Sequence, residues 1–342
     1  MKLDAGLGVE GAYLKSVGET ARAADALGFA GLWTSETKHD AFLPLAIAAN
    51  QTHRIQLGTS VAIAFSRSPM EVAQTAWDLQ DLSDGRFVLG LGTQVKAHVK
   101  RRFSMPWDKP VSRLREYILA LRAIWDSFQS GGSLNFEGDF YRHTLITPFF
   151  NPGPIQDPEI PIYIAGVNTN LSRLAGELCD GFHVHPFHSP EYVRRTVKPA
   201  IAEGASKEGR NLEDVELATS VLVVTGESEE EIEEGRENMR SQISFYASTP
   251  TYRTVLEAHG WEAVGEELGR LARDKKWNEM PQLITDEMLG AFAVEAAPDE
   301  LGSALRERYA GLIDRIALYI PFVSGERDEF WRTVVGSVRA GS

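Results

Sequence analysis

Histidines and one carboxylate stand at positions from which they could move protons. Glu36 and His39 come at the end of a short apolar segment, and His183 and His185 alternate along another. Alternation along a strand would direct these last two side chains to one face. Imidazoles and carboxylates are the usual general acids and bases of enzymes near neutral pH. We therefore expect Glu36, His39 and His185 to lie at adjacent strand ends and to act in proton transfer.

The same histidines leave a metal centre open as an alternative. His183 and His185 form an HxH pair, and neutral imidazole is a good metal ligand. A complete site needs further ligands from other strand ends, for which Glu36 and His39 are available. The pattern is compatible with a metal-dependent hydrolase, and equally with histidines that only line a pocket.

Glycines near the start of the chain fit a dinucleotide-binding turn. Gly6, Gly8 and Gly11 have the GxGxxG spacing, and Glu36 could contact a ribose after the next apolar segment. They also fit a glycine-rich turn of a barrel, which suits the number of strand segments better. We expect the barrel turn and keep an open sheet as the alternative.

A basic segment interrupts this acidic chain. Residues 94–115 hold seven lysines and arginines against one aspartate, whereas the whole chain has a net charge of -13. The segment follows the glycine-rich residues 87–93, whose backbone amides could approach a phosphate closely. We expect an anionic ligand to dock there, with a solvated helix face as the alternative.

Short β-branched segments alternate with amphipathic helices along the chain. This pattern is typical of βαβ units with a parallel sheet. It predicts an α/β fold, a closed (β/α)8 TIM barrel, with two separate domains as the alternative. The predicted strands are residues 2–8, 31–36, 55–63, 87–93, 162–166, 181–186, 215–225 and 313–320.

Two stretches depart from this alternation. Residues 131–161 combine short aromatic runs with five prolines, which predicts a hairpin-bearing insertion after the fourth strand. Residues 242–288 look helical and aromatic, which predicts a second insertion after the seventh strand. Because no low-complexity linker divides the chain, we expect residues 1–342 to form a single barrel domain.

Charge and composition exclude several classes of protein. The acidic balance argues against general nucleic-acid binding, which needs a basic surface. No apolar run approaches the roughly 20 residues that span a bilayer, and no export signal is recognisable, so we expect a cytoplasmic protein. Cys179 is the only cysteine, which excludes an intramolecular disulfide. The sequence leaves the oligomeric state open, a homo-oligomer included.

Several motifs together resemble one enzyme family. In order, they are ALGFAGLWTSE at 26–36, RIQLGTSV at 54–61, LSDGRFVLGLG at 82–92, RLREY at 113–117, PIYIAG at 161–166, LAGE at 174–177 and CDGF at 179–182. This succession resembles the bacterial luciferase-like superfamily, especially its deazaflavin-dependent oxidoreductases. The resemblance implies a TIM barrel with insertions that binds FMN or coenzyme F420 at the carboxyl ends of its strands.

The resemblance also implies roles for individual positions. Ser60 and Val61 match the site of a non-prolyl cis peptide bond that faces the cofactor ring. Thr37 stands where many deazaflavin enzymes have a histidine, so His39 is the candidate replacement. With Arg102 of the basic segment, the expected cofactor contacts are Thr37, Ser60, Val61, Thr93, Gln94, His98, Arg102, Ala165, Gly166, Val167 and Asn168.

Together these features predict an oxidoreductase that transfers a hydride between coenzyme F420 and a small organic substrate. We favour F420 over FMN because its phosphodiester and polyglutamate tail suit the basic segment. The alternatives are an FMN-dependent monooxygenase, a metal-dependent barrel hydrolase and a non-catalytic flavin-binding protein. The candidate walls of a substrate pocket are Trp33, Phe65, Trp107 and Tyr246.

Overall fold

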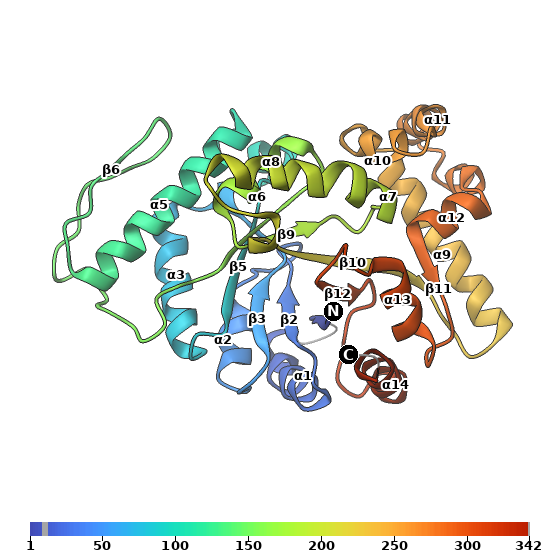
Figure 1. The fold of residues 1–342 in the computed structure, drawn as a ribbon, viewed down its shortest axis with the longest axis horizontal. Coiled ribbons are helices and arrows are strands. Elements are labelled where there is room, and N and C mark those ends of the chain that lie inside the picture. Colours follow the sequence, from blue (N-terminus) through green and yellow to red (C-terminus); the bar gives the residue numbers. More distant parts are fainter. Residues whose placement is uncertain (9–12, 341–342) are drawn as a thin grey trace.

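Eight parallel strands close into a barrel surrounded by helices (Figure 1). The computed structural model describes residues 1–8 and 13–340. In order around the ring, the strands are β1 (Lys2–Gly6), β2 (Gly31–Thr34), β3 (Gln56–Thr59), β5 (Phe87–Gly92), β8 (Ile162–Gly166), β9 (Gly181–Val184), β10 (Glu216–Val224) and β12 (Arg315–Leu318). The pairing of β9 with β10 and of β12 with β1 completes the ring. The predicted (β/α)8 TIM barrel is confirmed.

The barrel strands coincide with the eight predicted segments, although most are shorter at their ends. The predicted strand 55–63 divides into β3 and the two-residue β4 (Ala62–Ile63), which pairs with β5. One further strand, β11 (Ala293–Glu295), pairs with the outer part of β10 and was not predicted. Its three residues give too short a pattern to recognise.

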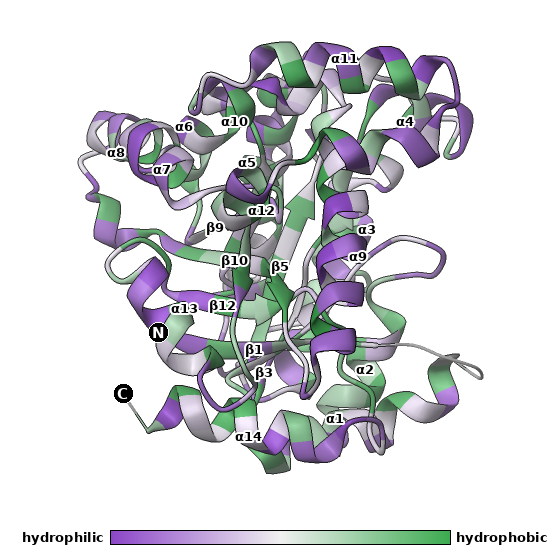
Figure 2. Ribbon diagram, turned by 90° about the vertical axis from the view of Figure 1, so that its right-hand side faces the viewer, coloured by the Kyte–Doolittle hydropathy of each residue, from purple (hydrophilic) through white to green (hydrophobic). Residues whose placement is uncertain are grey.

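Helices cover the outside of the barrel. Figure 2 shows hydrophobic strands at the centre of the molecule and hydrophilic residues along the outer helices. The helices are α1 (Tyr13–Leu27), α2 (Leu43–Ala49), α3 (Pro69–Leu82), α4 (Lys96–Arg101), α5 (Pro110–Ser130), α6 (Thr169–Leu178), α7 (Pro190–Tyr192), α8 (Lys198–Lys207), α9 (Glu229–Ala247), α10 (Arg253–Glu257), α11 (Glu262–Arg273), α12 (Asp286–Phe292), α13 (Leu301–Tyr309) and α14 (Asp328–Arg339). None of the helices in the described part of the chain combines the length and the apolarity that a membrane crossing requires.

The two irregular stretches have different structures. The first contains the antiparallel hairpin of β6 (Phe136–Glu137) and β7 (Arg142–His143). The carboxylate of Glu116 in α5 accepts hydrogen bonds from the backbone amides of residues 139, 140 and 141, which ties this hairpin to the helix. The second stretch is helical, as predicted, but its predicted start at residue 242 falls inside α9.

Ionic side chains fill the amino-terminal end of the barrel. Arg315 is fully buried and forms a two-pronged pair with Asp4, at 2.8 Å from Nε to Oδ2 and 2.9 Å from Nη2 to Oδ1. Its Nη1 also donates to Gln56 and lies 3.4 Å from Glu216 Oε2. The indole of Trp33 donates to Asp4 at 2.8 Å. This network links β1, β2, β3, β10 and β12 across the interior.

Candidate active site

Small residues line the inner face of the barrel near the carboxyl ends of its strands. Asp4, Tyr163 and Arg315 are buried inside the barrel. Because side chains alternate along a strand, the second residue after each of them also faces the interior. This alternation places Gly6, Ala165 and Ala317 at the mouth, with Ser220 beside Ala317 on the neighbouring strand. A methyl group added at Gly6 would meet no atom within 4 Å. The strands therefore leave room at the mouth, which is where TIM barrels hold their active sites.

Aromatic rings form the floor of this mouth. Trp33, Tyr163 and His183 pack together, with the His183 ring centroid 5.0 Å from Trp33 and 5.3 Å from Tyr163. His183 Nδ1 lies 3.5 Å from Ser60 Oγ, whereas its buried Nε2 has no hydrogen-bond partner among the described residues. Burial, helped by the Arg315 cation, lowers the pKa of His183 to about 3. This imidazole is therefore neutral at physiological pH.

The loops after β3 and β5 bring several predicted cofactor positions together. The peptide bond between Ser60 and Val61 is cis, which confirms that prediction. Val61 packs against the carboxyl end of β5, since an added Cβ at Gly92 would lie 2.6 Å from Val61 Cγ2. Gln94 has a φ of 59°, a left-handed conformation that favours glycine. Thr93 Oγ1 donates to the Gln94 carbonyl at 3.2 Å.

The basic segment lies next to the loop after β2. Arg102 donates a hydrogen bond to the backbone carbonyl of Thr37, so two predicted cofactor contacts meet here. The His98 side chain in α4 is exposed. The other exposed cations of this part, Lys96, Lys100 and Arg101, form no salt bridge with any residue that the structure describes. They leave a positively charged surface.

Part of the predicted basic cluster is neutralised. Arg113 is buried, donates to the Tyr141 hydroxyl at 2.9 Å and pairs with Asp108 at 3.3 Å. Arg115 pairs with Glu177 at 3.4 Å. These two arginines therefore stabilise the fold, and the surface available to an anion is smaller than the sequence suggested.

The loop after β8 presents a helix start to the mouth. Asn168 is the N-cap of α6, and its side-chain oxygen accepts from the Leu171 amide at 3.0 Å. The Val167 carbonyl accepts from the Tyr192 hydroxyl at 2.5 Å, which holds the loop in place. Gly166 must remain small because a Cβ would lie 2.6 Å from that of Leu171. Backbone amides at such a helix start are suited to a phosphate.

Glu36 is already engaged by other groups of the protein. Its Oε2 accepts from the Ile63 amide and from Arg67 Nη1, both at 2.7 Å, and the side chain is buried. Arg67 also pairs with Asp40 at 2.6 Å. Burial alone would raise the pKa of Asp40, but hydrogen bonds from the Leu43 and Phe42 amides and from Arg67 lower it. The carboxylate of Glu36 thus holds the β2 and β3 loops together, whereas His39 is exposed.

His185 lies on the other side of the mouth. Strands β2 and β9 are separated by three strands in one direction around the ring and by three in the other. The expectation that Glu36, His39 and His185 share adjacent strand ends was therefore wrong. His185 Nδ1 accepts from the Phe187 amide at 3.1 Å, which assigns the proton of the neutral ring to Nε2. Burial, with a contribution from His188, lowers the pKa of His185 to about 3.

Comparison with known proteins identifies the family. Residues 1–315 match the model of the luciferase-like monooxygenases. The chain belongs to this family. An uncharacterized protein of Mycobacterium tuberculosis is 46% identical over 304 residues, which cover 87% of this chain and 89% of the relative. The F420-dependent glucose-6-phosphate dehydrogenase of Amycolatopsis mediterranei is 26% identical over 338 residues, 94% of each chain.

The fold agrees with that assignment. The coenzyme F420-dependent tetrahydromethanopterin reductase from Methanopyrus kandleri superposes with a TM-score of 0.78 at 20% identity, covering 100% of this chain and 99% of that one. The likeness shows that this luciferase-like protein shares the barrel of that reductase. The resemblance inferred from the motifs is confirmed.

The alternative sites suggested by the sequence find little support in this luciferase-like protein. Within residues 1–8 and 13–340, no three His, Cys, Asp or Glu side chains are grouped so that they could hold a metal ion. The GxGxxG residues 9–11 lie outside the described residues. The strand that precedes them, β1, belongs to the closed barrel and not to an open sheet.

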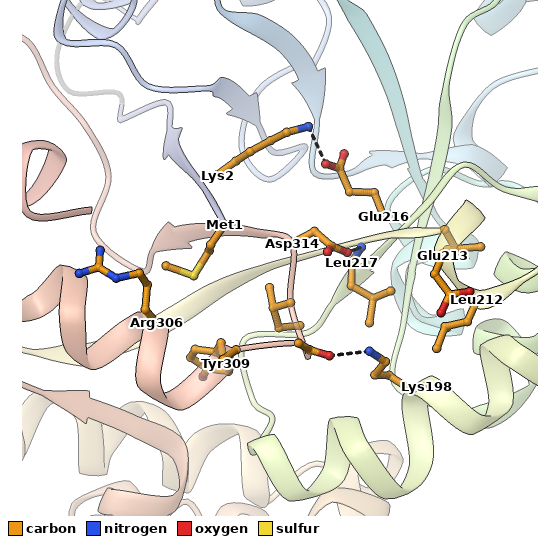
Figure 3. A pocket seen from close by; sticks show the side chains of 14 residues that line it. Met1, Lys2, Lys198, Leu212, Glu213, Glu216, Leu217, Arg306, Tyr309 and Asp314 are labelled. Atoms are coloured by element: carbon orange, nitrogen blue, oxygen red, sulfur yellow. Dashed lines mark hydrogen bonds and ion pairs between the residues drawn. The ribbon is translucent and has the colours of Figure 1, made fainter. Parts of the chain in front are cut away.

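A large cavity lies at the opposite end of the barrel. It has a volume of about 710 Å³, and its lining includes Lys2, Lys198, Glu216 and Asp314 (Figure 3). Both of its lysines are satisfied within the protein, since Lys2 pairs with Glu216 at 2.7 Å and Lys198 donates to the Gly311 carbonyl at 2.6 Å. Catalytic groups of TIM barrels come from the carboxyl ends of the strands, so this cavity is not the candidate active site.

Two neighbours of His185 were not predicted from the sequence. Tyr252 and Tyr319 contact the group that His185 and Tyr246 form. Tyr319 could have been found, because it lies near the end of the predicted strand 313–320 at the same parity as Arg315. Tyr252 belongs to the helical insertion and has no local signal. Of the four predicted aromatic wall residues, Trp33 lies in the floor, and Phe65 packs against Trp107 at 5.7 Å.

Proposed function

We propose that this protein is an oxidoreductase that transfers a hydride between coenzyme F420 and a small organic substrate. The observation that carries the proposal is the exposed basic surface of Lys96, Lys100, Arg101 and Arg102 beside a mouth lined by small residues. F420 carries a phosphodiester and a polyglutamate tail, and such anions are attracted to a positively charged surface. The F420-dependent relative from Amycolatopsis mediterranei supports the same cofactor.

The residues at the mouth fit such a cofactor. The small inner residues, among them Gly6 and Ala165, leave space for a flat ring system. The backbone of Ser60 and Val61 would face the middle of the ring, with Thr93 and Gln94 beside it. The amides of residues 165–168 would hold the phosphate, while Arg102, His98 and Thr37 would border the tail. When bound, the deazaflavin supplies or accepts the hydride.

Protein side chains have to manage the accompanying proton. We assign proton transfer to His39, the exposed imidazole after β2. His185 has a different role, because its strongly lowered pKa and its Nε2 proton make it a neutral hydrogen-bond donor. It would hold a substrate oxygen from the opposite side of the mouth. Glu36 would position the loop that carries His39 through its contacts with Ile63 and Arg67.

Titration with both cofactors tests the proposal. We expect saturable quenching of F420 fluorescence and much weaker binding of FMN. Binding of FMN with no detectable binding of F420 would overturn the choice and favour the monooxygenase alternative. Binding of F420 with no hydride exchange toward any substrate would favour a non-catalytic binding protein, and stoichiometric zinc in the purified protein would favour a hydrolase.

A variant of His39 tests the proton-transfer role. His39→Ala should lower the rate constant by about 10²–10⁴-fold, the usual contribution of a general acid or base, with unchanged F420 affinity. His53→Ala, another exposed histidine, is the matched control. Unchanged turnover of His39→Ala would remove this residue from the mechanism.

A further inference from the structure

Four aromatic rings gather over the carboxyl ends of β9 and β12. We call His185, Tyr246, Tyr252 and Tyr319 the tyrosine wall. The His185 ring centroid lies 4.5 Å from that of Tyr252 and 4.9 Å from that of Tyr246. The Tyr246 and Tyr319 hydroxyls are 2.6 Å apart. The members come from the ends of β9 and β12, from α9 and from the one-turn segment 250–252, so the insertion and the barrel build the wall together.

The tyrosine wall lies apart from the positions proposed for the cofactor. Those positions follow β2, β3, β5 and β8, whereas β9 and β12 occupy the other part of the ring. His185 and Tyr319 have the same inward parity as His183 and Arg315, which lie inside the barrel. The wall therefore borders the mouth on the side that the cofactor positions leave open.

The wall is electrically neutral. No salt bridge among the described residues includes any of its members. The electrostatic neighbours of His185, Tyr246 and Tyr252 are other members of the wall and His188. Burial raises the pKa values of Tyr246 and Tyr252 and lowers that of His185, so all three are uncharged near neutral pH. A carboxylate or phosphate held here would lose its hydration without gaining a counter-charge.

The wall nevertheless offers hydrogen-bond donors. Because His185 Nδ1 accepts from the Phe187 amide, the proton of the neutral ring lies on Nε2, which is a hydrogen-bond donor. In the Tyr246–Tyr319 pair one hydroxyl donates to the other, which leaves one hydroxyl hydrogen for a further acceptor. Tyr319 is 37% exposed and the other three members are half-buried, so a ligand can reach them. An oxygen that accepts hydrogen bonds between apolar ring faces would satisfy these groups.

We propose that the tyrosine wall is the substrate subsite and selects an uncharged alcohol or ketone with an apolar body. This inference rests on the proposed hydride-transfer function. Oxidation of the alcohol removes a hydride from carbon, taken up by the bound deazaflavin, and a proton from oxygen, taken up by His39 or solvent. Reduction of the ketone reverses both transfers. The wall holds the oxygen through His185 Nε2–H and packs its rings on the apolar body.

Matched ligands separate a neutral subsite from a charged one. The probes are acetone, cyclohexanone and acetophenone, each compared with an analogue that carries a carboxylate. Binding is measured by calorimetry, with and without F420. We expect the neutral member of a pair to bind at least tenfold more tightly.

Variants of wall residues test whether the preference for neutral ligands depends on the tyrosine wall. Tyr252→Leu removes one ring and His185→Leu removes the donor, and each should weaken binding of the preferred ketone at least fivefold. His185→Gln, which keeps a side-chain N–H donor, should recover part of the loss. Phe149→Leu is the control, because Phe149 is 88% exposed in the first insertion and its ring contacts that of Phe150. Thermal unfolding of each variant verifies that it is folded.

The outcomes distinguish the two proposals. Equal or tighter binding of the carboxylated analogues, no binding of any neutral probe, or unchanged affinity in Tyr252→Leu and His185→Leu would overturn the neutral subsite. These readouts do not depend on turnover. Failure of F420 to bind the wild-type protein would instead overturn the proposed function, even if neutral ketones bind the wall.

Discussion

The two ends of the barrel interior use polar groups in opposite ways. At the amino-terminal end, Arg315, Asp4, Glu216 and Gln56 satisfy one another inside the protein. At the carboxyl end, small residues leave space and His183 Nε2 has no partner among the described residues. A paired network stabilises a fold, whereas a buried polar atom without a partner is a feature that needs a separate explanation. The stabilising network and the proposed active site thus lie at different heights of the same strands.

Loss of the Arg315 cation should give the largest effect. Arg315→Met leaves Asp4, which is 2% exposed, buried without its counter-ion. Removal of one partner of a buried ion pair costs about 3–5 kcal/mol, and we expect this loss of unfolding free energy in urea titrations. Arg101→Met at the exposed mouth surface is the control and should change stability by less than about 0.5 kcal/mol. A cost at Arg315 below about 1 kcal/mol would contradict the contrast between the two ends.

Two glycines on the adjacent strands β1 and β2 test the same difference between the two ends of the barrel, with smaller expected changes in stability. An added Cβ at Gly31 would lie 2.6 Å from Arg315 Nη2 and 2.9 Å from Asp4 Oδ1, whereas one at Gly6 would meet no atom within 4 Å. We expect Gly31→Ala to destabilise the protein by about 1–3 kcal/mol through overpacking. Gly6→Ala should preserve stability and weaken cofactor binding. Equal stability of the two variants in thermal unfolding would contradict the expected difference between the crowded position at Gly31 and the open position at Gly6.

A fall in pH should destabilise the folded protein through His183, which lies in the aromatic floor between the two ends of the barrel. Burial, with the Arg315 cation, lowers the pKa of His183 from 6.5 to about 3. The unfolded chain then binds the proton that the folded chain excludes, so stability is full above the unfolded pKa and is lost as the pH falls toward the folded value. One such histidine accounts for about 2 kcal/mol between about pH 7 and about pH 5.

The variant His183→Phe tests this assignment. Between about pH 7 and about pH 5, the unfolding free energy of this variant should fall less than that of the wild type. The difference should equal the contribution of one histidine, about 2 kcal/mol. His185 and His188 have similarly lowered pKa values and keep the rest of the slope. The unfolding free energy is measured by urea titration at both pH values. If it falls equally in the variant and in the wild type, His183 is not the group that excludes the proton.

Charge reversal at the mouth should give the smallest effect. Arg101→Glu and Arg102→Glu should each weaken F420 binding several-fold, since an exposed ion pair contributes up to about 1 kcal/mol. The loss should shrink as salt screens the charges. Arg332→Glu, an exposed reversal on α14, is the control. F420 affinity that is unchanged at low salt in both mouth variants would remove the basic surface from the binding site.

The sequence was sufficient for the barrel because each buried parallel strand has its own short, mainly apolar segment. The motif around Ser60 and Val61 was enough to place the cis peptide bond. The adjacency of Glu36 and His185 was wrong for a reason that the fold itself contains: in a ring of eight strands in chain order, the second and sixth lie opposite. Arg67, the partner of Glu36, and Tyr252 of the tyrosine wall depend on contacts between distant elements, which no local pattern records.

The pair of Asp4 and Arg315 joins positions 311 residues apart. A ribosome therefore completes nearly the whole chain before the first strand can meet the last. During that interval Asp4 keeps its hydration, and an ionised carboxylate on the inner face of an unfinished sheet opposes its association with other nascent chains. Arg315 removes this protection by neutralising the charge, and it does so only when the ring can close. The carboxylate of Asp4 thus opposes association while it is unpaired, and it stabilises the closed ring once it is paired with Arg315.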